Sequence, residues 1–215
     1  MENHINTALL MLDGAMVTLE LFFITIIVAL PLGFLAGILR ISPFKPVRAV
    51  MEFYVWIMRG TPLMLQLLFV YFALPMVGIL LPSMGAALLA FILNYAAYFA
   101  EIFRSGILAV PKGQFEAAKA LGMTYSQTMR LIILPQVIKI VLPPISNETI
   151  NLVKDTSLIY ILAMNDLLRV ARTIVQREFD MTPFAIAAVF YLVMTFVLTW
   201  AFKKLEAHFG KYNVQ

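Results

Sequence analysis

Hydrophobic residues along the chain gather into long runs that short polar segments separate. Five of these runs are long enough to cross a bilayer, because a membrane helix needs about 20 consecutive apolar residues. The runs cover residues 16–39, 51–73, 84–110, 136–162 and 183–202. The pattern therefore predicts an all-α membrane protein with five transmembrane helices, which together form a single transmembrane domain over residues 1–215.

Prolines inside two of the runs are expected to disturb the helices. Pro31 lies in the first run, and Pro143-Pro144 interrupt the fourth. Neighbouring helices make such prolines tolerable in a membrane because other groups satisfy the freed backbone atoms. We expect Pro143-Pro144 to break the fourth helix near the middle of the membrane. Asp13-Gly14 is expected to form a cap and turn before the first run.

The composition agrees with a membrane protein. Hydrophobic residues make up 62% of the chain and charged residues 13%, with a mean hydropathy of +0.90, whereas soluble domains are about half apolar and about a quarter charged. The absence of cysteine excludes disulfides and thiolate metal sites. The two histidines, His4 and His208, lie near opposite ends and do not form an obvious metal cluster. The first residues lack a basic region and a cleavage site, so no removable signal peptide is expected.

The basic residues predict how the spans are oriented. Cytoplasmic loops are enriched in lysine and arginine, and five spans with the N-terminus outside would place nine basic residues on the cytoplasmic side. These are Arg40, Lys45, Arg48, Lys112, Lys119, Arg130, Lys203, Lys204 and Lys211. This orientation also accounts for the net charge of +4 without a nucleic acid partner. Residues 165–180 then lie outside, and their apolar positions predict an amphipathic helix on the outer rim.

The longest polar segment between two spans covers residues 111–135 and is predicted to be structured. Residues 114–121 are mostly good helix formers, and Gly122 stands where a helix often ends in a left-handed residue. Thr124 and Gln127 have the spacing of a capping box, which starts a second helix. We therefore expect two short helices joined at a glycine, forming a rigid unit on the cytoplasmic face.

This segment carries a motif that resembles the EAA loop of permease subunits of ABC importers. The motif consists of Glu116-Ala117-Ala118, three residues, Gly122, nine residues, and Ile132-x-Leu134-Pro135. The resemblance implies the type I ABC importer permease fold, in which the loop couples the permease to a separate ATPase subunit. On this pattern the ATPase-coupling residues are Glu116, Ala117, Ala118 and Gly122.

Three further motifs resemble the polar amino acid branch of that family, of the histidine, arginine and glutamine type. They are Arg59-Gly60-Thr61-Pro62, residues 100–106, and Asn147-Glu148 with residues 154–158. The resemblance extends over about residues 16–205 and implies a multi-pass protein of the bacterial inner membrane. Its implied partners are ABC ATPase subunits, an external substrate-binding protein, and a second permease subunit that is either this chain or a close homologue.

The sequence contains no nucleotide site of its own. A phosphate-binding G-x-x-x-x-G-K-[ST] motif is absent from the sequence, so the chain is expected to be a transport subunit and not an enzyme. No cofactor is expected in this chain, and ATP with its Mg²⁺ would bind to the partner ATPase.

Polar residues inside the third and fourth predicted spans recur at helical spacing. Each set shares one helix face, and the sets are Asn94, Tyr98, Glu101 and Ser105, then Glu148, Asn151 and Asp155. A charge at the centre of a membrane helix costs about 3 kcal/mol on insertion scales, and such residues usually face a cavity or one another. We therefore predict a substrate cavity lined by Asn94, Tyr98, Glu148, Asn151 and Asp155.

Carboxylates in a water-filled pocket favour a cation, and the ring of Tyr98 could stack on a guanidinium. A basic amino acid such as arginine, lysine or histidine fits this cavity best. Structural roles stay open for the same groups, because Glu148 could pair with Lys154 and Glu101 with Arg104. The run of residues 154–157 fits either role, and Arg59 fits a gate or a subunit interface. The sequence fixes neither the amino acid transported nor whether the permease pair is homomeric.

The leading hypothesis is the permease subunit of an ATP-driven importer of polar amino acids, among which the cavity favours basic ones, that works by alternating access. An ion-coupled secondary amino acid carrier is the alternative; it shares the buried carboxylates but does not account for residues 111–135. An intramembrane protease is disfavoured because the only histidines are at positions 4 and 208.

Overall fold

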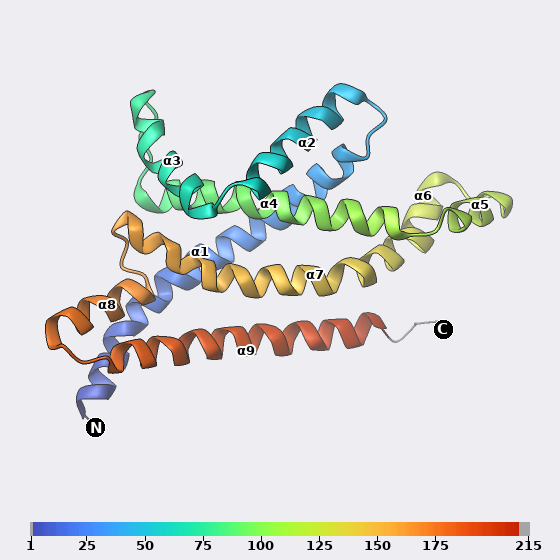
Figure 1. Cartoon of the computed structure of the whole chain (residues 1–215). Helices are drawn as coiled ribbons and strands as arrows, with labels where there is room; N and C mark the ends of the chain where they lie inside the picture. Colours follow the sequence, from blue (N-terminus) through green and yellow to red (C-terminus); the bar gives the residue numbers. More distant parts are fainter. Residues whose placement is uncertain (1, 211–215) are drawn as a thin grey trace.

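The computed structural model describes the backbone of residues 2–210, and the side chains from residue 7 onward, as an all-α arrangement (Figure 1). Its long helices are α1 (Glu2–Arg40), α2 (Lys45–Gly60), α3 (Leu63–Met76), α4 (Ser83–Ala109), α7 (Leu134–Asp155) and α9 (Thr182–Gly210). Its shorter elements are α5 (Lys112–Ala120), α6 (Tyr125–Thr128), the π-helix η1 (Met129–Ile133), the 3₁₀-helix η2 (Thr156–Leu162) and α8 (Leu167–Glu178).

Several of these helices are long and apolar enough to cross a membrane. Within the described residues there are four such stretches, namely Thr7–Arg40, Ser83–Ala109, Tyr125–Leu162 and Thr182–Gly210. Helices α2 and α3 add a fifth candidate if they count as one span, although they meet at an angle of 105°. The predicted all-α fold with multiple spans is confirmed.

The run predicted over residues 51–73 is not one straight helix. Thr61 (φ −122°, ψ 147°) and Pro62 (φ −62°, ψ 136°) are extended and separate α2 from α3. Proline has no N–H to donate, and its ring disfavours the helical conformation for the residue before it. The chain therefore leaves the helix at Thr61 and starts a new helix in another direction.

Two other local predictions are wrong. Asp13 and Gly14 lie inside α1 and form neither a cap nor a turn, because the helix begins well before the first apolar run. Pro143 and Pro144 do not break α7, which is helical from Leu134 to Asp155. Both prolines lack an N–H, but α4 and α9 pack against α7 and hold it in one helix.

Helix α4 occupies the centre of the fold and contacts α1, α2, α3 and α7. Figure 1 shows α1 crossing α4 and α7 obliquely. The crossing of α1 and α4 is close because Gly33 and Gly37 face α4. A Cβ at Gly33 would lie 2.4 Å from the Cβ of Phe99, and one at Gly37 would lie 2.9 Å from the carbonyl oxygen of Ala100. Small residues let membrane helices approach and gain van der Waals contact.

The amphipathic helix predicted over residues 165–180 is confirmed as α8. Leu167, Ala171 and Ile174 are buried, and α8 packs against α1 and α9. Asp166 begins the helix, since its carboxylate accepts hydrogen bonds from the backbone N–H of Leu168 (3.1 Å) and Arg169 (3.2 Å). Burial raises the pKa of Asp166 from 3.8 to about 6.

The polar segment before α7 forms the predicted pair of short helices. Gly122 has φ +72°, the left-handed conformation that separates α5 from α6. The capping box is present, because the N–H of Gln127 donates to Thr124 Oγ1 (3.3 Å) and the N–H of Thr124 donates to Gln127 Oε1 (2.8 Å). The two helices project from one end of the long helices (Figure 1).

The close approach of α1 to α4 predicts a position that does not tolerate a side chain. In Gly33→Ala the new methyl group overlaps Phe99, so the helices must separate, and we expect a loss of about 1–3 kcal/mol in stability. Thermal unfolding of the purified protein in detergent measures the loss. Gly113→Ala is the matched control, because a Cβ at Gly113 meets no atom within 4 Å. An unfolding midpoint for Gly33→Ala equal to that of the control would contradict the packing.

Candidate functional site

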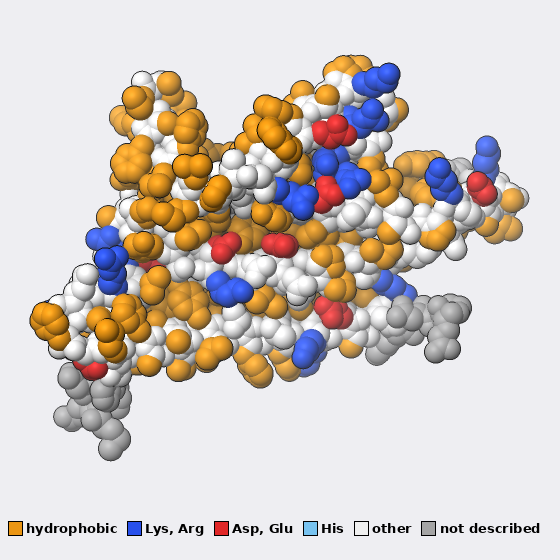
Figure 2. Space-filling model, viewed as in Figure 1, with side chains coloured by type: hydrophobic (Ala, Val, Ile, Leu, Met, Phe, Trp, Pro, Cys, Tyr) orange, Lys and Arg blue, Asp and Glu red, His pale blue; other side chains and the backbone are white. Residues whose placement is uncertain are grey.

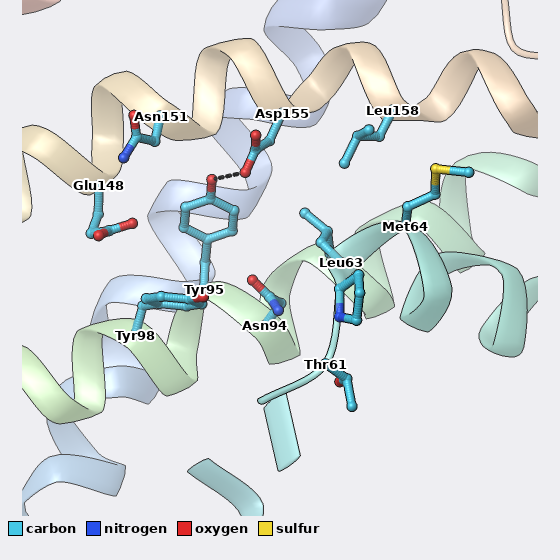
Figure 3. Close-up of a pocket in the computed structure, with 11 residues that line it drawn as sticks. Thr61, Leu63, Met64, Asn94, Tyr95, Tyr98, Glu148, Asn151, Asp155 and Leu158 are labelled. Carbon is cyan, nitrogen blue, oxygen red and sulfur yellow. Dashed lines mark hydrogen bonds between the residues drawn. The ribbon is translucent and has the colours of Figure 1, made fainter. Parts of the chain in front are cut away.

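A cavity of about 460 Å³ lies between the α2–α3 break, α4 and the end of α7. All five sequence-predicted substrate residues line it, and Figure 3 shows them directed toward a common space. Its lining consists of Thr61, Pro62, Leu63, Met64, Asn94, Tyr95, Tyr98, Glu148, Asn151, Asp155 and Leu158. The structure thus brings together residues from α4 and α7 that the sequence placed on two separate helix faces. Their contact with a substrate remains a prediction.

One wall of the cavity is acidic. Glu148 and Asp155 project from α7, two turns apart on the same face. The hydroxyl of Tyr95 donates to Asp155 Oδ2 at 2.7 Å (Figure 3), so one carboxylate oxygen is engaged. Figure 2 shows acidic side chains in the furrow between α4 and α7.

Tyr95 was missed by the sequence prediction. It is 2% exposed and lies next to Asn94, one position off the polar face of α4. A tyrosine inside a membrane span could have been noticed, because a buried tyrosine hydroxyl usually finds a hydrogen-bond partner. The predicted carboxylates on the fourth span were candidates for that partner, and Asp155 is the one that the structure shows.

Asn94 lines the cavity, but its amide nitrogen is already engaged. Asn94 Nδ2 donates to the carbonyl oxygen of Met58 (3.0 Å) and to Gln66 Oε1 (3.0 Å). Gln66 Nε2 in turn donates to the carbonyl oxygens of Met58 (2.9 Å) and Thr61 (3.2 Å) and to Thr61 Oγ1 (2.7 Å). These two amides satisfy carbonyls at the α2–α3 break. Asn94 is therefore a positioning residue whose side-chain oxygen alone is left for a ligand.

The start of α3 forms the wall opposite the acidic one (Figure 3). Pro62 is its N-cap and provides no side-chain hydrogen bond, so the N–H groups of the first turn have no partner within the helix. A helix N-terminus carries partial positive charge. Leu63 and Met64, in this turn, line the cavity. The cavity therefore has carboxylates on one side and the N-terminal turn of a helix on the other.

Arginines surround the carboxylate of Glu101, beyond Tyr98 on α4. Glu101 forms ion pairs with Arg40 of α1, with Arg104 (Nε to Oε2, 3.2 Å) and with Arg59 of α2 at 3.7 Å. The pairing with Arg104 confirms the structural alternative for Glu101. The guanidinium carbon of Arg59 also lies 5.4 Å from the centre of the Tyr98 ring.

The other structural alternative is not supported. Among the described residues Glu148 and Lys154 do not form an ion pair, and Lys154 is exposed. The described residues also contain no group of three or more His, Asp or Glu side chains placed to hold a metal ion.

The predicted ATPase-coupling residues divide into two kinds. Glu116, Ala117 and Gly122 are exposed on the α5–α6 segment, so a partner can reach them. Ala118 is 0% exposed in this chain, so its side chain packs inside the segment, and its contact with a partner stays a prediction. Leu121 (79% exposed) and Tyr125 (76% exposed) lie on the same segment and were not among the predicted residues. They are exposed apolar side chains on either side of Gly122.

The chain matches a known family over most of its length. Residues 29–211 fit the model of the family described as "Binding-protein-dependent transport system inner membrane component". The chain is 39% identical over 197 residues to the arginine transport system permease protein ArtQ of Bacillus subtilis (strain 168), covering 91% of this chain and 90% of that protein. It is 38% identical over 200 residues to the putative glutamine transport system permease protein GlnP of Rickettsia felis, covering 92% of each.

Further relatives agree in sequence and in structure. The L-cystine transport system permease protein TcyB of Bacillus subtilis (strain 168) is 36% identical over 201 residues, covering 93% of this chain and 86% of that protein. The solved structure described as "Crystal structure of an amino acid ABC transporter with histidines" superposes with a TM-score of 0.88 at 35% identity, covering 96% of this chain and 97% of that one.

The amide pair of Gln66 and Asn94 at the α2–α3 break predicts that loss of one amide lowers both stability and substrate binding. Gln66→Met keeps the length of the side chain but leaves the carbonyls of Met58 and Thr61 short of donors, at a cost of about 1–3 kcal/mol. We expect a lower unfolding midpoint and weaker binding of a labelled amino acid to the assembled complex. Gln176→Met, on the exposed face of α8, is the control. Wild-type stability and binding in Gln66→Met would show that the amide pair does not hold the break.

Proposed function

This chain belongs to the family of binding-protein-dependent transport system inner membrane components, and on that premise we propose that it imports polar amino acids with a preference for basic ones. As a member it is the permease component of an ABC amino acid importer. It is a multi-pass protein of the inner membrane and has no ATPase domain. The transport system therefore includes ATPase and binding-protein partners. Membership of this family favours an ATP-driven importer over the alternative of an ion-coupled carrier.

The pair of carboxylates on the acidic wall carries the proposed preference. The relatives are named for arginine, glutamine and cystine, so likeness to them does not select a substrate. Glu148 and Asp155 face one cavity and form no ion pair among the described residues, although the charge of Arg59 acts on Glu148 from a greater distance. Both side chains are half-buried, and a carboxylate in an apolar surrounding is costly unless a cation pairs with it. A substrate with a cationic side chain supplies that cation, whereas glutamine does not.

The two walls together suit a whole amino acid. A cationic side chain directed at Glu148 and Asp155 leaves the α-carboxylate facing the start of α3. Free N–H groups at a helix N-terminus favour an anion, and discontinuous helices commonly form the substrate sites of transporters near the middle of the membrane. The cavity of about 460 Å³ lies within the usual range of about 300–1,000 Å³ for small-molecule sites.

The α5–α6 segment is proposed to receive force from the ATPase subunit. Glu116, Ala117 and Gly122 form the contact, Leu121 and Tyr125 extend it with apolar surface, and buried Ala118 supports the segment from within. Closure of the ATPase subunits on ATP then moves the segments of two permease subunits toward each other. The spans alternate between states that bind the substrate with different affinity.

A second permease subunit and the binding protein complete the proposed assembly. Helix α3 exposes apolar side chains that a second copy or a close homologue could cover, among them Leu65, Phe69, Phe72 and Met76. The predicted orientation places α8 at the outer face, where an external binding protein delivers the substrate.

The acidic wall predicts a selective loss of basic amino acids. Glu148→Gln and Asp155→Asn remove one charge each with little change in shape, and we expect each to weaken arginine binding about tenfold or more, equivalent to about 1.4 kcal/mol. Glutamine binding should change less. Equilibrium binding of both labelled amino acids to the assembled complex measures the difference.

Asp13→Asn is the control for this prediction, because Asp13 is exposed on α1 and the substitution makes the same change in net charge. Wild-type affinity for arginine in both cavity variants, with assembly intact, would remove the proposed preference.

The α5–α6 segment predicts variants that lose the ATPase. Gly122→Val forces a β-branched residue into a left-handed conformation, with a strain of about 1–3 kcal/mol, and Leu121→Asp places a charge in the apolar part of the contact. Both should reduce the amount of ATPase subunit that co-purifies and the ATP-dependent uptake in proteoliposomes. Lys119→Gln, also exposed on this segment, should retain both. Full ATPase recovery with either variant would move the contact elsewhere.

A further inference from the structure

A second cavity of about 480 Å³ adjoins the first. Its lining residues come from α1, α2 and α4 and are Arg40, Glu52, Val55, Trp56, Arg59, Gly60, Tyr98 and Glu101. Tyr98 lines both cavities. Glu101 lies one turn beyond Tyr98, toward the end of α4 that leads into α5. The second cavity is therefore nearer the α5–α6 segment, and Tyr98 stands at the boundary between the two.

Arg59 connects the two helices at this boundary. It lies in the last turn of α2, one residue before the helix ends at Gly60. Its guanidinium carbon is 5.4 Å from the centre of the Tyr98 ring, and its Nη1 is 3.7 Å from Glu101 Oε2. An arginine over an aromatic face is attracted by the ring quadrupole. Arg59 thus ties α2 to α4 while it covers the ring that the substrate is proposed to use.

The contact of Arg59 is one that can open without leaving a buried charge alone. Glu101 keeps the closer ion pairs with Arg40 and Arg104 when Arg59 moves away. Removing one partner of a buried pair is costly mainly because the other charge is left uncompensated, and that does not occur at Glu101. Arg59 also interacts electrostatically with Glu148, the carboxylate toward which the substrate's cation is proposed to be directed. The Arg59 side chain is 41% exposed, so it has solvent-accessible space to enter.

We propose that Arg59 competes with the substrate for the face of Tyr98, and that a cationic side chain displaces its guanidinium. This proposal rests on the proposed preference for basic amino acids. The exchange places one cation where another lay, so the charge near Tyr98 is conserved. A neutral amino acid cannot make that exchange. Displacement also removes the contact of Arg59 with α4 and joins the two cavities, while the hydrogen bonds made by Asn94 and Tyr54 still hold α2 to α4. Arg59 is thereby a specificity-determining residue.

Three variants in the complex assembled with its ATPase subunit test the competition. Arg59→Gln removes the competing cation, Arg59→Lys keeps the charge but loses the planar group that stacks, and Arg48→Gln removes an exposed arginine of the same helix. We expect Arg59→Gln to tighten arginine binding roughly three- to tenfold and Arg59→Lys to tighten it by an intermediate factor. Glutamine binding and the Arg48→Gln control should stay within about twofold of the wild type.

Two results would overturn the competition. Weaker arginine binding in Arg59→Gln would make Arg59 a ligand of the substrate. Wild-type binding in Arg59→Lys, together with tightening in Arg59→Gln, would reduce the effect to net charge without stacking.

A second measurement separates this proposal from the substrate preference. The sequence contains no cysteine, so Val50→Cys on α2 and Leu108→Cys on α4, both exposed, can carry one pair of spin labels in each copy of the chain. We expect arginine to lengthen the distance between the labels, and Arg59→Gln to show the longer distance without any amino acid. A label distance in Arg59→Gln equal to that of the wild type without amino acid would contradict the displacement. Equal affinity of the wild type for arginine and glutamine would contradict the preference for basic amino acids instead.

Discussion

Backbone carbonyl groups in a membrane interior must find donors within the protein, because the hydrocarbon offers none. The bend between α2 and α3 creates such groups where the helix ends at Thr61. Gln66 and Asn94 supply the missing donors to the carbonyls of Met58 and Thr61. Because these amides come from α3 and α4, the bend, the direction of α3 and the position of α4 are fixed together. The cavity exists because this arrangement is satisfied.

Helix α4 supports both the fold and the site, because one of its faces packs against α1 and another lines the cavity. Ala96 and Ala100 lie where Gly33 and Gly37 of α1 approach most closely, so this face has no room for larger side chains. Asn94, Tyr95 and Tyr98 face the cavity. Beyond it, Glu101 forms ion pairs with three arginines. Since one rigid helix carries all of these groups, a displacement of α1 or α7 against α4 is transmitted directly to the cavity.

The sequence predicted features that depend on one segment at a time. The turn at Gly122 and the capping box of Thr124 follow from local spacing and conformational preference, and they are confirmed. Helical spacing also brought Asn94 and Tyr98 to one cavity with the polar face of α7, whereas Glu101 and Ser105 do not line it. Partners distant in the chain were not predictable in this way. The bonds of Tyr95 to Asp155 and of Gln66 to Asn94 depend on which helices become neighbours. The continuity of α7 through Pro143 and the burial of Ala118 likewise reflect packing, which outweighs local preference.

The distribution of partners among the acidic residues is the strongest argument for a ligand in the cavity. Glu101 is paired with arginines from α1, α2 and α4, so the fold can neutralise a carboxylate inside the helices. Among the described residues Glu148 and Asp155 form no such ion pair. Asp155 accepts a hydrogen bond from a tyrosine, and Glu148 is hydrogen-bonded to an asparagine of α7 and interacts with the charge of Arg59 without a close contact. Leaving two carboxylates without an ion pair is costly in an apolar surrounding. A cation that arrives from outside the chain offsets that cost. Arg59, whose guanidinium lies 3.7 Å from the Glu101 carboxylate and 5.4 Å from the centre of the Tyr98 ring, lies at the boundary where it can respond to that cation.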